Sequence, residues 1–222
     1  MELKFLYHAL ATGLSGQITV PFQKTIEVKA PSSLPFTGGY ASSLEKEFRY
    51  EQILSFASAE TVTTGSETAN FFDTLATSTI EGLNILNVVT ADRVVARLAS
   101  KYSKDKGERS VTFAGSHFHN LRIAGCPVEV AVDPARTKTA RHSARAQYGT
   151  FATSIDLKNC PGVERLDDGG LHVPQFGKIY LAESVVTSSY QTISMVRVSL
   201  GCAVEGHIVL GHASTNGEPM PG

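Results

Sequence analysis

The amino-acid sequence predicts an all-β protein built from antiparallel hairpins, arranged as a sandwich or a barrel-like stack. Two observations support this fold class: the dominant hydrophobic period is two residues, and a hairpin-like segment recurs along the chain. A parallel β-solenoid is the alternative, although the repeats are too unevenly spaced for a regular one. With 222 residues, 42% of them hydrophobic and 18% charged, the chain is long enough to bury one core as a single domain over 1–222.

The first two strands are predicted at residues 3–14 and 18–28, with a turn at Ser15 and Gly16 between them. In the second strand the even positions are mostly apolar and the odd positions are mostly polar, which is typical of a half-buried strand. Pro21 has no backbone N–H to donate, so this strand is expected at a sheet edge. Residues 31–43 are predicted to form a loop, because they are rich in Pro, Ser and Gly.

The next segment, 44–56, fits two structures. Ser42 and Glu45 form the capping box of a short helix, whereas the alternation through Phe48 and Tyr50 fits a strand. Residues 57–75 are rich in Thr, Ser and Gly and are expected to hold a strand and a turn.

An internal echo predicts two hairpins. The segment 78–85 (STIEGLNI) matches 116–123 (SHFHNLRI) at a constant offset, which makes Leu83 and Leu121 equivalent and predicts that both are buried. A two-residue turn candidate follows each copy and is expected to pair Ile85 with Val88 in the first copy. In the second copy the same turn is expected to pair Ile123 with Cys126. A fainter third copy relates the sequence at 125–129 to 201–205.

In the C-terminal part, residues 133–149 are predicted as a basic loop or short helix, with Asp133 as the N-cap and Gly149 at the end. A loop is expected at 169–177, where Asp167 and Asp168 precede two glycines in a turn. Strands are predicted at 178–186, 192–200 and 202–210, followed by a flexible tail at 213–222.

Several of these segments resemble bacterial β-rich modules of the choice-of-anchor type. The resemblance covers about residues 78–211 and is carried by GLNILNVVTADRVVARL, NLRIAGCPVEV, VPQFGKIYLAESV and SMVRVSLGCAVEGHIVLG. It implies a β-module with a structural or surface-associated role. The chain departs from those modules because it shows no secretion signal and no sorting motif, which places a cell-surface location in doubt.

Two pairs of histidines lie close together in the sequence. His117 and His119 have the His-x-His spacing that can direct two imidazoles from one strand face towards a metal, but no third ligand lies at a fixed short distance. They are weak candidates, and the sequence predicts neither a metal nor another cofactor. His207 and His212 are five residues apart and would face opposite sides of an unbroken strand.

Charge singles out one candidate interaction segment. Arg136, Lys138, Arg141 and Arg145 form a local basic patch that could contact an acidic surface on another subunit. The net charge of −1 and the absence of interleaved aromatic residues argue against a nucleic-acid partner. No stretch is apolar enough to span a membrane.

The three cysteines, Cys126, Cys160 and Cys202, form neither a complete disulfide set nor a CxxC metal motif. We expect three free thiols in a cytoplasmic protein, with a surface-associated protein, or one exported without a cleaved signal, as the alternative.

The sequence lacks the motifs of a nucleophile elbow, a phosphate loop, a dinucleotide fold or a zinc protease, which favours a non-catalytic protein. The predicted function is a structural or interaction module that self-associates into a homo-oligomer. The first alternative is a carbohydrate-type ligand-binding protein that uses the loops at 31–43 and 159–177. The second is an enzyme with dispersed catalytic residues.

Overall fold

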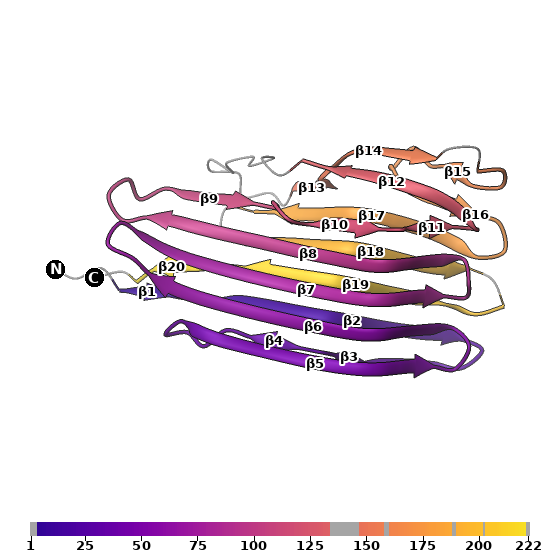
Figure 1. Ribbon diagram of the computed structural model, residues 1–222, viewed down its shortest axis with the longest axis horizontal. Coiled ribbons are helices and arrows are strands. Elements are labelled where there is room, and N and C mark those ends of the chain that lie inside the picture. The colour runs from indigo at the N-terminus through magenta and orange to yellow at the C-terminus, as the bar shows by residue number, and fades with distance from the viewer. Residues whose placement is uncertain (1–3, 134–146, 158–159, 188–189, 202, 221–222) are drawn as a thin grey trace.

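The structure is a computed structural model that describes residues 4–133, 147–157, 160–187, 190–201 and 203–220. These residues form two antiparallel β-sheets stacked face to face, and no helix occurs among them (Figure 1). The predicted all-β sandwich is confirmed. None of the described residues belongs to a helix long and apolar enough to cross a membrane.

Sheet I is formed, in spatial order, by β14 (Ala152–Leu157), β12 (Cys126–Val132), β11 (Arg122–Ile123), β8 (Val89–Ser103), β7 (Phe71–Ile85), β6 (Leu54–Glu67) and β5 (Gly39–Tyr50). Two short strands, β9 (Arg109–Thr112) and β10 (His117–His119), also pair with β8.

Sheet II is formed by β15 (Glu164–Arg165), β16 (Leu171–Val173), β17 (Gly177–Val186), β18 (Gln191–Gly201), β19 (Glu205–Thr215), β2 (Ala9–Val20) and β3 (Lys24–Lys29). Two further strands extend it, because β13 (Gln147–Thr150) pairs with β17 and β4 (Ser32–Ser33) pairs with β2.

The chain follows a meander that returns to its start. It begins in sheet II with β2 and β3, crosses to sheet I for β5 to β12 and β14, and returns to sheet II, where β19 pairs with β2. In Figure 1 the yellow β19 therefore lies beside the indigo β2. A small ribbon of β1 (Phe5–Leu6) and β20 (Glu218–Pro219) brings the two ends of the chain together. Residues 213–220, predicted as part of a flexible tail, are thus largely built into strands.

The two predicted hairpins are present, with one correction to the register. Ile123 pairs with Cys126, as predicted. Ile85 pairs with Val89 instead of Val88, because Val88 is an extra residue after the predicted turn. Its N–H donates to the Ile85 carbonyl at 2.9 Å, and its carbonyl accepts the Ala124 N–H at 2.8 Å.

The predicted burial of Leu83 and Leu121 is confirmed, since each is 2% exposed. The structure also shows how the two copies are related in space. Strands β7 and β11 both pair with β8, and their registers place Leu83 and Leu121 on opposite sides of Ala91. The echo therefore reflects two strands that share one partner.

The N-terminal hairpin differs from the prediction. β2 continues through Ser15 and Gly16 to Val20, and the turn lies instead at Pro21–Gln23. Ile18 and Ile26 are buried on either side of this turn, while Phe22 is 80% exposed. The regular alternation in this segment concealed the turn, because a hairpin can keep the same apolar period on both of its strands.

The segment 44–56 is not a helix. It contains the second half of β5, a turn at Glu51–Ile53 and the start of β6. Residues 57–75 complete β6 and begin β7, as expected for a strand and a turn. Of the segment predicted as a basic loop or short helix, residues 134–146 lie outside the described residues, and Gln147–Thr150 is a strand.

In each sheet, one row of residues that runs across the strands marks a change in which side chains face the core. Within a strand, even-numbered residues face the core on one side of this row and odd-numbered residues on the other, or the reverse. We call this a change of parity. In sheet I this row, called crease I, consists of Glu47, Ala57, Gly82, Asp92 and Asn120. In β7, for example, the buried residues have even numbers up to Ile80 and odd numbers from Leu83 onward. Glu47, Gly82 and Asn120, on alternate strands, have left-handed backbones with φ of 55°, 64° and 51°. The pairing on either side of the row keeps one register.

Crease II, in sheet II, consists of Ala30, Gly13, Gly211, Met195 and Ala182. Here too the left-handed residues alternate with extended ones, with φ of 48°, 61° and 52° at Ala30, Gly211 and Ala182. At crease I two successive residues of a strand point to solvent, whereas at crease II two successive residues point to the core. Side chains of sheet II therefore fill the space that sheet I leaves.

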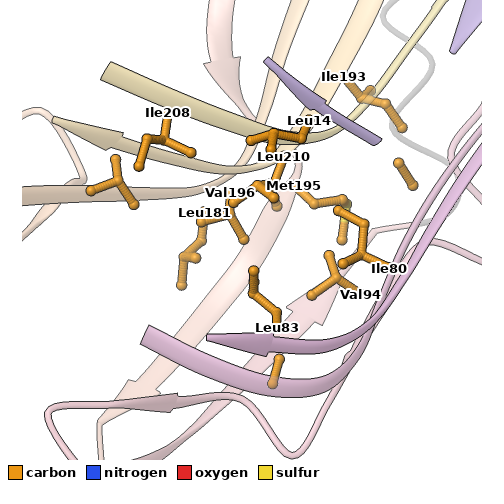
Figure 2. Close-up of a cluster of buried hydrophobic side chains, with 14 of the residues drawn as sticks. Leu14, Ile80, Leu83, Val94, Leu181, Ile193, Met195, Val196, Ile208 and Leu210 are labelled. Carbon is orange, nitrogen blue, oxygen red and sulfur yellow. The ribbon is translucent and has the colours of Figure 1, made fainter. Parts of the chain in front are cut away.

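The creases face each other across the core. A Cβ on Gly211 would lie 3.7 Å from Cγ1 of Val94 in sheet I, and a Cβ on Gly13 would lie 2.7 Å from Cβ of Ala59. Figure 2 shows the resulting cluster of buried apolar side chains from both sheets, which includes Leu14, Ile80, Leu83, Val94, Leu181, Met195, Val196 and Leu210. Each such side chain contributes about 1.5–3 kcal/mol through burial.

Candidate interaction surface

Both sheets end on the same side of the sandwich, at β3 and β5, and we call this side the β3–β5 surface (Figure 1). In the described part of the chain, β5 pairs only with β6 and β3 only with β2. β5 has 12 residues, against six in β3, six in β14 and two in β15, so it is the longest edge strand. Such an edge presents backbone donors and acceptors to any strand that can approach it.

Side chains, not a backbone ladder, join β3 to β5. The Nζ atom of Lys24 lies 5.0 Å from the ring centroid of Tyr50, and that of Lys29 lies 5.4 Å from the ring centroid of Phe48. Lys29 Nζ is also 3.8 Å from Oε1 of Glu45. These contacts place the middle of β3 over the middle of β5 and leave the in-plane edge of β5 open.

Exposed apolar side chains gather on this surface. Among the described residues, nine large apolar side chains are exposed, and six of them belong to β3, β5 or the segments next to them: Val20, Phe22, Val28, Phe36, Tyr40 and Leu44. Phe22, Phe36 and Tyr40 are 80%, 67% and 63% exposed. Single exposed apolar residues are ordinary on a protein surface, but their concentration beside an open edge marks a contact region.

Crease I reaches this edge at Lys46 and Glu47, which both point to solvent. On the inner strands of sheet I, the charged side chains at crease I have partners. Arg93 Nη2 lies 2.5 Å from Glu81 Oε1, and Asn120 Nδ2 donates to Asp92 Oδ2 at 2.5 Å. Lys46 and Glu47 have no ion pair within the described residues. Two opposite charges therefore stand side by side in the second half of β5, without an ion-pair partner among the described residues.

The histidines of the His-x-His pair lie on the outer face of β10. His117 Nδ1 is 2.9 Å from the Gly115 carbonyl oxygen, and His119 Nδ1 is 3.6 Å from Asp92 Oδ2. Within the described residues, no group of three or more His, Cys, Asp or Glu side chains could hold a metal ion.

His207 and His212 lie on the same outer face of sheet II, contrary to the expectation for an unbroken strand, because crease II inverts the parity of β19 between them. Ser194 Oγ is 3.0 Å from His212 Nδ1, a spacing that suits a nucleophile and a base. The adjacent carboxylate, Glu183, is instead held by Arg197 in two bonds of 2.6 and 2.8 Å. These groups therefore do not form a catalytic triad.

Arg197 belongs to a structural network on this outer face. Its guanidinium lies 3.8 Å from the ring centroid of Tyr180, whose hydroxyl donates to Asp168 Oδ2 at 2.9 Å. The backbone N–H of Gly170 donates to the other oxygen of Asp168, and these bonds lower the pKa of that carboxyl. The predicted Asp-Gly turn is confirmed, since Gly169 N–H donates to the Leu166 carbonyl within the β15–β16 hairpin.

The remaining predicted interaction sites are the basic segment and the two loops. Arg136, Lys138, Arg141 and Arg145 lie outside the described residues. The predicted loops also contain strands: β4 and the start of β5 fall within 31–43, and β15 and β16 within 159–177. They lie at opposite sides of the sandwich, so one ligand cannot contact both (Figure 1).

A shallow groove of about 810 Å³ crosses the outer face of β6 to β9. Its lining includes the hydroxyl-bearing residues Thr64, Ser110 and Thr112 and the ion pair between Lys101 and Asp73, with 3.4 Å between Nζ and Oδ1. It contains polar groups that could bind a hydroxylated ligand.

Sequence reasoning missed the β3–β5 surface. The apolar residues Leu44, Phe48 and Tyr50 all have even numbers, so the sequence carried no signal of the parity change at Lys46 and Glu47. The exposure of Phe22 and Phe36 likewise had no signal, since an apolar residue in a short loop has no periodic context.

One protein family, described as Domain of unknown function (DUF8256), matches residues 5–160 of the chain. The matched range includes the whole β3–β5 surface and ends before β15. No curated protein and no solved structure matches the chain.

Proposed function

The chain belongs to the DUF8256 family, and from the geometry of its sheet edges we propose that it is a non-catalytic structural module that self-associates through the β3–β5 surface. The observation that carries the proposal is that the longest edge strand coincides with six of the nine exposed large apolar side chains of the described residues. An open edge next to exposed aromatic residues is costly for a monomer, because it invites uncontrolled strand addition. A defined partner strand removes that cost.

Light scattering coupled to size-exclusion chromatography tests this proposal. The wild-type chain is expected to form an oligomer at micromolar concentration, with an interface of at least about 1,000 Å². Replacing Tyr40 and Leu44 together by Ser should shift the chain towards monomer while the β-rich circular dichroism spectrum stays the same. Tyr190→Ser is the matched control, because Tyr190 is also an exposed aromatic residue but lies immediately before β18, away from this surface.

The basic segment provides a separate proposed contact. Reversing the charge at Arg141 and Arg145 should weaken assembly if this segment reaches an acidic neighbour, and the effect should grow at low salt. An oligomer that is lost in the Tyr40 and Leu44 variant but unaffected by these reversals assigns the contact to the β3–β5 surface alone.

Ligand binding is the second candidate function, and the groove over β6 to β9 is the observation that favours it. Carbohydrates suit a surface that offers hydroxyl groups and charged hydrogen-bonding groups. Titration with a panel of oligosaccharides, followed by NMR shifts of Thr64 and Ser110, tests this candidate. A ligand that binds without shifting Thr64 or Ser110 would argue against this groove as the binding site.

A further inference from the structure

We infer that the partner at the β3–β5 surface is a second copy of the chain, whose β5 pairs antiparallel with β5 of the first about a twofold axis between Lys46 and Glu47. This inference rests on the proposed self-association and specifies its register. The two copies of sheet I would then form one continuous sheet, with crease I running through both.

The facing pattern of β5 is symmetric about this axis. Side chains that face one another across an antiparallel pair must lie on the same face of the sheet. Reading away from the axis in either direction, the side chains of β5 point outward, inward, outward and inward. The proposed register therefore pairs Lys46 with Glu47, Glu45 with Phe48, Leu44 with Arg49 and Ser43 with Tyr50, each residue with its counterpart on the second copy.

Neighbouring registers fail this requirement. A shift by one residue in either direction places inward side chains of one copy opposite outward side chains of the other. A strand of regular alternation would accept many registers, but the parity change at Lys46 and Glu47 leaves one register that matches over all eight residues from Ser43 to Tyr50. A register centred on Ser43 also matches in facing, over residues 39–47, but it places Lys46 opposite Tyr40. Charge therefore decides between the two alignments.

Charge favours the same register. Lys46 of each copy lies opposite Glu47 of the other, so the symmetric pair contains two ion pairs at its centre. Both side chains lack an ion pair within the described residues of one copy. An axis through Lys46 itself would place Glu45 opposite Glu47, and like charges directly opposite each other are destabilising. Charged side chains on an edge strand usually discourage strand addition, but in this register the central charges that meet are of opposite sign.

The exposed part of β3 fits the same axis. Lys24 lies at Tyr50 and Lys29 at Glu45, so the axis passes β3 near Glu27 and Val28. Val28 is 44% exposed in one copy and would be brought close to Val28 of the second. The two edges on this side of the sandwich are thereby covered together.

Charge reversal tests the register. In Lys46→Glu every central contact becomes a pair of carboxylates, and in Glu47→Lys every central contact becomes a pair of ammonium groups. Each single variant is expected to raise the dimer dissociation constant by about tenfold or more, since two attractive pairs become repulsive. An equimolar mixture of the two variants should restore a dimer of near wild-type affinity, because the mixed dimer contains two opposite-charge pairs.

Analytical ultracentrifugation of each variant and of the mixture measures these constants. Lys106→Glu is the control, because it reverses an exposed charge in the turn between β8 and β9, far from the edge. Circular dichroism and thermal unfolding establish that each variant is folded. Hydrogen exchange adds a readout that needs no variant: amides of residues 43–50 should gain protection as the wild-type concentration rises, while those of the opposite edge strand β14 should not.

The outcomes separate the two proposals. A monomeric wild type at high micromolar concentration overturns both self-association and the register. A dimeric wild type whose single reversals bind as tightly as the parent, or whose mixture shows no recovery, overturns the register and leaves self-association standing. Concentration-dependent hydrogen-exchange protection of β14 in place of β5 also overturns the register and leaves self-association standing. Weaker dimerisation of both single variants, with recovery of the dimer in their mixture, supports the inference.

Discussion

Gly211 lies opposite Met195 in the two central strands of sheet II, and a Cβ on Gly211 would come within 3.2 Å of Cβ of Met195. Its φ of 61° is in the left-handed region, which suits Gly better than residues with a side chain. The contact shows how crease II forms. β19 adopts a left-handed backbone at Gly211, which has no side chain, and Met195 of β18 occupies the space beside it.

Replacing Gly211 by Ala should destabilise the fold through both backbone strain and crowding. The left-handed conformation costs about 1–2 kcal/mol for an alanine, and the close contact with Met195 adds to this. Gly125→Ala is the matched control, since Gly125 has φ of 78° but nothing lies within 4 Å of its added Cβ. Urea unfolding should show a larger loss for Gly211→Ala. Equal losses would mean that the packing at crease II is loose.

Thr61 ties the two sheets together near crease II. Its hydroxyl is buried and donates to the Ala30 carbonyl at 2.8 Å. Thr61→Val keeps the shape and removes the donor, so the free energy of unfolding should fall by about 1–3 kcal/mol. Thr79→Val on the outer face of β7 is the control and should change stability little. An unchanged unfolding midpoint for Thr61→Val would show that this bond contributes nothing.

Burial of His212 makes stability depend on pH. Desolvation lowers the pKa of His212 below its ordinary 6.5, so in mildly acidic solution the unfolded chain binds a proton more readily than the folded chain. Stability from this group is present above pH about 6.5 and is lost as the pH falls from there to the lower pKa of His212 in the folded chain. His212→Gln should reduce the fall in melting temperature between pH 7 and pH 5. Identical pH profiles for the variant and the wild type would contradict this role.

The thiol of Cys160 should react slowly in the folded protein. Burial, together with a hydrogen bond with Cys126, raises the pKa of Cys160 to about 11. At pH 8 only about one such thiol in a thousand is ionised, and the thiolate is the reactive form. Mass spectrometry after alkylation should show slow modification of Cys160 in buffer and three modified cysteines in denaturant without reductant. Fast native alkylation of Cys160, or fewer than three thiols on denaturation, would contradict these expectations.

The sequence by itself determined the fold class, the strands at β17 and β18 and the burial of Leu83 and Leu121, because these depend on local alternation and on short turns. The pairing of Ile123 with Cys126 was also predictable, since a two-residue turn leaves its flanking residues directly opposite each other. For the first copy the same rule placed the turn correctly but not the register, because the extra residue Val88 is held by a hydrogen bond from Ala124 of another strand.

Only the tertiary structure decided where β2 ends, which residues form the creases and which edge is exposed. The parity change at Gly211 brings that residue against Val94 of the opposite sheet, and alternation within one strand carries no information about that sheet. The exposure of Phe22, and the lack of an ion pair for Lys46 and Glu47 among the described residues, likewise depend on which strands lie beside β3 and β5. Local periodicity reports which residues of one strand are apolar. Whether a strand edge or a side chain is exposed depends on which other strands pack against it in the folded chain.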